Sequence, residues 1–243
     1  MNLSLLLRAG LSALLIASAA PAFAADPSSS DLLRAYDKVM GPPNFEAVVR
    51  MTAHRDDGSV RNYKMAMLKK GDDKFRIAFR EPAAVVGQEL LRQGDNLWVY
   101  MPNLKRAVRL ANRDSFQGGD FNNADVLRVN YEADYTSVAS ADGDAWLLEL
   151  KGKTTNASYD KIKLWLRKAD LQPLKGEYYT ASGKMLRKAE FSDHKDYAGL
   201  KRPGKIVMRN MLATARWSEM AWDSLNTGVN PPATKFVLDD LGK

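Results

Sequence analysis

The sequence GDNLWVYMPNLKR, at residues 94–106, contains a short strand that is apolar on both of its faces. The opening GDN favours a turn, and residues 97–101 are apolar or aromatic throughout. Pro102 ends the strand, because proline presets the backbone for a turn and has no N–H for a neighbouring strand. A strand with two apolar faces has to be covered on both sides. We therefore expect either a lid formed by the chain itself or an apolar ligand over this part of the sheet.

The segments around this strand alternate between apolar and polar residues instead. Phe75, Ile77 and Phe79 share one face of residues 74–80, with lysine, arginine and alanine between them. This period of two indicates a sheet with one face in water. Similar strand patterns occur at residues 45–55, 60–69, 131–139, 145–151, 161–167, 174–180, 185–191, 205–212 and 214–222. The sequence therefore predicts ten or eleven antiparallel strands.

Two segments depart from the strand pattern. The first is a predicted helix that Ser30 can cap and that Gly41 ends, with an apolar stripe at helical spacing between them. The second is residues 111–129, which are rich in Asn, Asp and Gly. Asn123 can cap a short helix at residues 124–129. We expect this second segment, which interrupts the sheet at its centre, to form the lid.

The amino terminus has the features of an export signal. Residues 1–24 carry one charge, Arg8, then a short apolar core and the small-x-small pattern Ala22-Phe23-Ala24. That core is too short for a good membrane span. Residues 25–243 are then expected to form a single domain. The complete lack of cysteine fits a bacterial periplasm, and the dispersed net charge of +7 provides no basic block for nucleic acid.

The sequence offers little for catalysis or metal binding. It has two histidines in polar settings and none of the usual nucleophile, phosphate-loop or dinucleotide motifs. Asp120, Asn122 and Asp125 resemble the start of a calcium loop, but Tyr131 stands where such a loop needs its final glutamate. We therefore expect no enzymatic activity, no cofactor and no bound metal.

One large sheet with so few helices cannot have its apolar face covered by helices. The sheet is expected to curl over itself and leave a hollow, as ligand-binding barrels do. Methionine, which is flexible, suits surfaces that accept ligands of varying shape, although an ordinary core containing methionine is the alternative. A lipid carrier would need such a hollow and a lid, because each exposed CH₂ costs about 0.8 kcal/mol. The predicted lipid-binding residues are Met51, Met65, Met67, Phe75, Phe79, Trp98, Tyr100, Leu164 and Met208.

Four stretches also carry a family resemblance. They are LWVYMP at 97–102, SFQGGDF at 115–121, LWLRKADLQP at 164–173 and YYTASGK at 178–184. They resemble the LolA-like family of outer-membrane lipoprotein-sorting proteins, in its longer branch. The resemblance implies a mostly β (α+β) fold, in which a single large antiparallel sheet curls into an unclosed β-barrel with a short helical lid. Members of the longer branch often accompany inner-membrane transporters of the RND superfamily, so the implied cargo is a lipoprotein or a free lipid.

Two functions are expected on this basis. The first is a monomeric periplasmic carrier that binds acyl chains and moves them from an inner-membrane transporter to an outer-membrane acceptor. It would touch membranes transiently and bind no nucleic acid. The alternative is an envelope sensor or transporter accessory module of the same fold that moves no lipid. Arg106, Arg109 and Arg113 are then the expected partner-docking residues, unless they are simply solvated.

Overall fold

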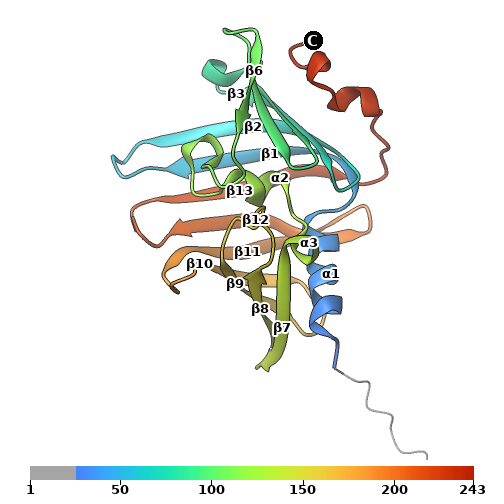
Figure 1. Cartoon of the computed structure of the whole chain (residues 1–243), viewed down its shortest axis with the longest axis vertical. Coiled ribbons are helices and arrows are strands. Elements are labelled where there is room, and N and C mark those ends of the chain that lie inside the picture. Colours follow the sequence, from blue (N-terminus) through green and yellow to red (C-terminus); the bar gives the residue numbers. More distant parts are fainter. Residues whose placement is uncertain (1–25) are drawn as a thin grey trace, which may run out of the picture.

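The computed structural model describes residues 26–243, which form one 13-stranded antiparallel sheet (Figure 1). The strand order is β6-β5-β4-β3-β2-β1-β13-β12-β11-β10-β9-β8-β7, so consecutive strands lie side by side except β6 and β7, and the first strand pairs with the last. The predicted signal at residues 1–24 lies outside the described residues. Among residues 26–243 no helix is both long enough and apolar enough to cross a membrane.

The elements have the following bounds. The strands are β1 (Asn44–His54), β2 (Val60–Lys70), β3 (Lys74–Glu81), β4 (Glu89–Gln93), β5 (Asn96–Met101), β6 (Arg106–Leu110), β7 (Tyr135–Asp142), β8 (Ala145–Gly152), β9 (Lys161–Arg167), β10 (Pro173–Tyr179), β11 (Met185–Tyr197), β12 (Leu200–Asn210) and β13 (Trp217–Asn226). The helices are α1 (Ser29–Met40), α2 (Asn123–Leu127) and α3 (Tyr131–Asp134), with short 3-10 turns η1 (Ala83–Val85), η2 (Phe116–Gly118), η3 (Ala233–Phe236) and η4 (Leu238–Asp240).

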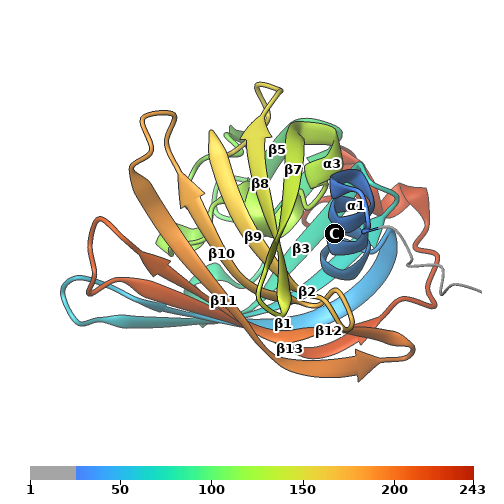
Figure 2. The same cartoon turned by 90° about the horizontal axis from the view of Figure 1, so that it is seen from below.

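The sheet curls strongly but does not close. Its two outermost strands, β6 and β7, do not pair with each other, and the chain between them carries η2, α2 and α3. Figure 2 shows the strands wrapping around a concave face, with α1 and α3 on the same side as that face. The predicted mostly β, unclosed barrel with short helices is therefore confirmed.

Helix α1 covers part of the concave face. Ser28 caps it by accepting a hydrogen bond from the backbone N–H of Asp31 at 3.1 Å, two residues before the predicted cap. Its buried stripe contains Leu32, Leu33 and Tyr36, and the helix contacts β7, β8 and β12. Amphipathic spacing thus places the apolar side of this helix against the inside of the sheet.

The structure has more strands than the sequence pattern predicted. Strand β4 was missed because Leu90 and Leu91 are both fully buried, one on each face, so no alternation is visible. Strand β6 was missed because it is a largely exposed edge. The predicted strand at residues 131–139 instead begins as α3, since Asn130 caps that turn by accepting from the N–H of Ala133.

The outer face of strands β3 to β5 is covered by the end of the chain, which is red in Figure 1. Phe236 and Leu241 pack against Leu91 there, with Tyr100 beside them. Arg76, on β3, forms ion pairs with Glu89 on the neighbouring strand and with Asp240 of the terminal segment. The cover expected over the two-faced strand is therefore the C-terminal segment, and no ligand is needed on this outer side.

Removing the main anchor of this segment should destabilise the protein. We expect Phe236→Ala to lower the free energy of unfolding by about 3–5 kcal/mol, because its fully buried ring leaves a cavity when deleted. The matched control is Val237→Ala, since Val237 is 41% exposed. Urea unfolding of both variants measures the difference, and equal stabilities would show that the segment is not anchored as described.

Candidate functional site

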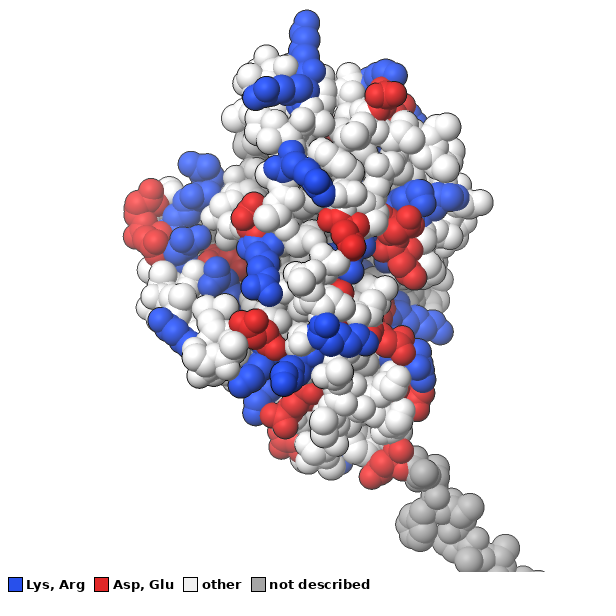
Figure 3. All heavy atoms as spheres, viewed as in Figure 1, with Lys and Arg blue, Asp and Glu red and all other residues white. Residues whose placement is uncertain are grey.

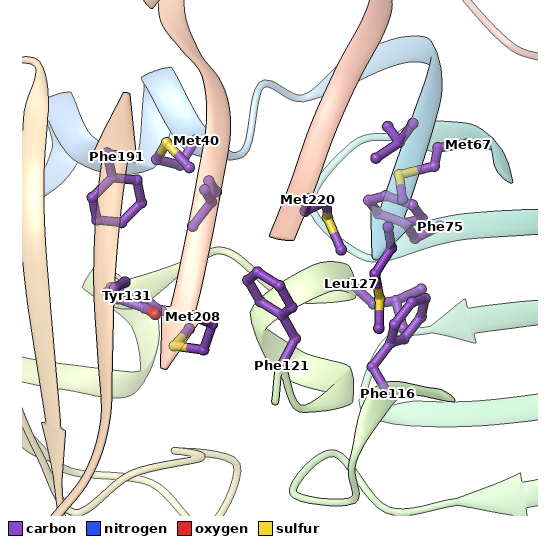
Figure 4. Packing of buried hydrophobic residues seen from close by; sticks show 14 of the residues in the cluster. Met40, Met67, Phe75, Phe116, Phe121, Leu127, Tyr131, Phe191, Met208 and Met220 are labelled. Atoms are coloured by element: carbon purple, nitrogen blue, oxygen red, sulfur yellow. The ribbon is translucent and has the colours of Figure 1, made fainter. Parts of the chain in front are cut away.

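The hollow, meaning the space inside the concave face of the sheet, is lined by apolar side chains from many strands. Most of the predicted lipid-binding residues are buried in the cluster that fills it. Figure 4 shows Met67, Phe75 and Met208 projecting from the sheet into this cluster. The residues that the structure brings together are Met51, Met65, Met67, Phe75, Phe79, Leu164 and Met208. Whether they bind lipid stays a prediction.

Trp98 and Tyr100 are placed elsewhere. Leu97 and Val99 belong to the cluster inside the barrel, and successive side chains of a strand point to opposite faces. Tyr100 therefore lies on the outer face, where it contacts the C-terminal cluster and Gly242. Both faces of this strand are apolar, so the sequence could not decide which pair faces inward. In the structure Leu97 and Val99 face inward, and Trp98 and Tyr100 do not line the hollow.

The lid, residues 111–129, fills the hollow from its open side. Its side chains Phe116, Phe121 and Leu127 are buried, and Figure 4 shows all three pointing into the cluster. The Phe116 ring lies 6.2 Å from the ring of Phe79. Helix α2 is capped by Asn122, one residue before the predicted cap, in a capping box with Asp125. The segment predicted to be the lid therefore fills the hollow with its own side chains.

With the lid in this position little space is left. The remaining cavity has a volume of about 40 Å³. Measured in this way, a cavity needs roughly 10–15 Å³ to hold one water molecule, so there is room for only a few. Met40, Met67, Phe75, Phe121 and Met220 are among the residues that line it. An acyl chain therefore requires the lid side chains to leave, and the structure shows the closed form.

Cationic side chains donate hydrogen bonds to backbone carbonyls of the lid and of the end of α1. Arg92 donates to the carbonyl of Leu127, the last residue of α2, at 3.2 Å and to that of Asp72 at 2.8 Å. Lys69 donates to the carbonyl of Gly41 at 2.7 Å. Burial lowers the pKa of Lys69 to about 8 and that of Arg92 to about 10. The lid is therefore held by hydrogen bonds as well as by apolar contact.

Further tethers connect the lid to the other edge of the sheet. Arg113 donates to the carbonyl of Ala157 at 3.1 and 2.6 Å. Asp125 accepts a hydrogen bond from the hydroxyl of Tyr159 at 2.9 Å. Residues 157 and 159 precede β9, so these contacts bridge the gap between the two free edges. The gap is closed by side chains of the lid and not by strand pairing.

The aspartate of the suspected calcium motif is committed to other bonds. Asp120 is buried and accepts hydrogen bonds from Asn210 and Ser218, each at 3.0 Å. Its backbone N–H donates to the Ser218 hydroxyl at 3.0 Å. This arrangement fastens the lid beside β13. Within residues 26–243 no cluster of three or more acidic, histidine or cysteine side chains has the arrangement of a metal site.

The three arginines expected to dock a partner are exposed, but they differ in their contacts. The side chain of Arg106, on the β6 edge, makes no hydrogen bond or ion pair with the described residues. Arg109 donates to the side chain of Asn96, and Arg113 is the lid tether described above. On the face shown in Figure 3, Lys and Arg are interspersed with Asp and Glu. No single-sign block marks a docking surface on this face, and partner docking stays untested.

Two half-buried carboxylates, one in the lid and one on α1, make the stability of the protein depend on pH. Burial raises the pKa of Asp125 to about 6, against lowering by hydrogen bonds from Asn122 and Tyr159. Burial likewise raises the pKa of Asp37, on α1, to about 6, although it accepts N–H bonds from Tyr131 and Glu132. The ordinary pKa of an aspartate is 3.8. Between pH 6 and pH 3.8 the folded protein therefore binds protons on these two groups, and the unfolded chain does not.

The free energy of unfolding is therefore expected to rise as pH falls from 6.5 to 4.5, by roughly 1–3 kcal/mol. The exposed carboxylates with lowered pKa, such as Asp31 and Asp57, lose their stabilising effect only below about 3.8. Thermal unfolding at the two pH values measures the change. Asp125→Asn, which keeps an acceptor oxygen, should reduce the rise, and an unchanged pH profile in that variant would contradict the assignment.

The charged residues of the hollow were not predicted from the sequence. Strict alternation assigns Lys69 to the same inward face of β2 as Met67. In the same way it assigns Arg202 to the same face of β12 as Met208. Arg92 follows Leu90 in the same way on β4. The sequence feature that could have identified these residues is a cation at an inward-facing position near the end of a strand. Charged groups on an apolar face must find partners, so such positions are informative.

A family model described only as an uncharacterized protein matches residues 71–243. A LolA superfamily protein of Nitrosomonas europaea is 26% identical with a TM-score of 0.79, covering 88% of this chain and 99% of that one. An outer-membrane lipoprotein-sorting protein domain of Vibrio parahaemolyticus is 23% identical with a TM-score of 0.75, covering 89% and 98%. A DUF1329 family protein of Desulfovibrio piger is 22% identical with a TM-score of 0.80, covering 88% and 97%. No curated protein sequence matches this chain.

Proposed function

The chain belongs to the LolA superfamily, and we propose that it is a periplasmic carrier that binds acyl chains in its hollow and transfers them from the inner to the outer membrane. The observation that carries the proposal is the apolar concave face plugged by the chain's own lid, with a cavity of only about 40 Å³ left. The name of the Vibrio relative, an outer-membrane lipoprotein-sorting domain, supports the direction of transfer.

Exchange between lid and cargo explains how such a carrier can load. When Phe116, Phe121 and Leu127 leave the hollow, the apolar lining from the sheet is uncovered. An acyl chain that enters gains about 0.8 kcal/mol for each CH₂ removed from water. The apolar area lost by the lid is thus replaced by that of the cargo. Loading and release are then close in free energy, as a shuttle requires, and the proposal involves no catalytic step.

The alternative is a sensor or accessory module that docks on an envelope transporter and moves no lipid. One observation favours it, because the hollow is already well filled without cargo. Arg106 and Arg109, exposed along the free edge β6, would then be docking residues. The two functions differ in whether the purified protein alone moves lipid.

Transfer of a fluorescent phospholipid between zwitterionic vesicles tests the proposal. A carrier is expected to accelerate transfer in proportion to its concentration, and R106E/R109E should transfer at the same rate, since these residues lie away from the hollow. Absence of any acceleration, together with charge-dependent capture of an inner-membrane transporter domain, would favour the docking module instead.

A further inference from the structure

Arg202, on β12, is a buried cation without a partner of opposite charge. Its side chain is only 1% exposed, and Nε and Nη2 have no hydrogen-bond partner among the described residues. The guanidinium stacks on the ring of Trp222, 4.3 Å from its centroid. The ionisable groups that act on it are the hydroxyls of Tyr36 and Tyr197, and burial lowers its pKa to about 10, which leaves it charged at neutral pH.

The other buried cations each make at least one hydrogen bond or ion pair, although Nε of Arg92 also lacks a partner. Lys69 and Arg92 donate to backbone carbonyls, and Arg76 pairs with Glu89 and Asp240. Arg202 differs from them because its guanidinium makes no hydrogen bond and no ion pair within residues 26–243. A buried charge in this state destabilises the protein. Retaining it suggests that a ligand supplies the missing acceptor.

Arg202 also lines the cavity described above. The apolar residues in the same lining include Met40, Ile206, Met220 and Trp222. The carboxylates that line the same cavity are Asp72 and Asp125, and no ion pair joins either of them to Arg202. The unpaired donors therefore lie at the wall of the space that an acyl chain would occupy.

We propose that Arg202 binds the anionic group, a carboxylate or a phosphate, of an amphiphile whose acyl chain replaces the lid side chains in the hollow. The planar guanidinium matches both groups through paired hydrogen bonds. The inference rests on the proposed carrier function and narrows its cargo. The acyl chains of a lipoprotein are attached through ester and amide bonds and carry no charge, so an anionic free lipid is the class of cargo that fits.

Binding of three single-chain amphiphiles to the purified protein tests this assignment. The probes are palmitate, lysophosphatidate and the neutral monopalmitin, and the variants are R202M, R202Q and R202K. For R202M and R202Q we expect the affinity for the preferred anionic probe to fall roughly 10- to 100-fold, as for loss of a charge-assisted hydrogen-bond pair. R202K, which keeps the charge but loses the paired planar donors, should fall between R202M and the original protein, and monopalmitin should bind all variants alike. The anionic probe that binds more tightly shows whether Arg202 prefers a carboxylate or a phosphate.

Thermal unfolding separates this role from a structural one. A binding role predicts that R202M without ligand is at least as stable as the original protein, because an unpaired buried charge is removed. A loss of stability with unchanged relative affinities would show that Arg202 only packs against Trp222 and would overturn the inference. If none of the three probes binds the original protein, the carrier proposal itself fails, whereas binding of monopalmitin alone leaves the carrier and removes the anion site.

Discussion

A disulfide that fastens the lid to the sheet is expected to abolish amphiphile binding, and its reduction to restore it. The variant is G119C/S218C, which joins the lid segment between Phe116 and Phe121 to β13. An ideal Cβ at Gly119 lies 3.0 Å from the Ser218 hydroxyl oxygen, so two cysteines there have the proximity a disulfide needs. The terminal methyl of Met51 is in contact with the added Cβ and must shift. The chain has no cysteine, so no other pairing competes.

The physical reason is the volume of the closed hollow. With the lid fixed, only about 40 Å³ remains, so the acyl chain stays in water. If even five CH₂ groups are kept out, the loss is about 4 kcal/mol, or roughly 1,000-fold in affinity. Binding of a fluorescent fatty acid before and after reduction measures it. The reduced variant and the two single variants are matched controls, and an oxidised variant that binds as well as the reduced one would show that the lid does not gate the hollow.

Met67→Asp is expected to lower amphiphile affinity by at least roughly 30-fold, because it puts a carboxylate where the acyl chain would lie, and burying such a group costs several kcal/mol. Met67 is 4% exposed and lines the cavity beside Phe75. Met67→Leu keeps the apolar volume and should bind like the original protein. Met67→Asn, with the same shape as Asp but no charge, separates the effect of charge from that of polarity.

The pH dependence of this variant gives an internal check. Burial raises the pKa of a carboxylic acid, so the introduced Asp should be neutral at pH 5 and charged at pH 8. Affinity should therefore recover in part at pH 5 in Met67→Asp but not in Met67→Asn. Circular dichroism confirms that each variant is folded before binding is compared. Full binding by a folded Met67→Asp at pH 8 would remove Met67 from the site.

Much of the fold follows from residues that are close in sequence. Alternation such as that of Phe75, Ile77 and Phe79 predicted strands and their inward faces, because the period of a strand leaves little choice once one face is apolar. The hairpin turn at residues 142–144 was predicted from its Asp-Gly-Asp sequence and joins β7 to β8. The lid was predicted from the absence of any period in residues 111–129, and its helix begins one residue before and ends two residues before the predicted bounds.

What could not be predicted depends on partners far away in the chain. Leu97 to Tyr100 are apolar on both faces, and only the packing of Phe236 and Leu241 from the other end of the chain shows which face is outside. The same is true of Arg202, whose isolation depends on what α1 and β13 bring near it. Its inward position follows from the register of β12, but not the lack of a carboxylate partner.

Native mass spectrometry of the protein purified gently from the periplasm tests the central claim, that the hollow is a cargo site for acyl chains, most directly. We predict a population whose mass exceeds that of the polypeptide by one amphiphile, and the bound molecule can be released and identified. An anionic free lipid would agree with the role inferred for Arg202, and an acylated peptide would support the carrier but not that role. Only the bare polypeptide mass, also after incubation with membrane vesicles, would contradict the account.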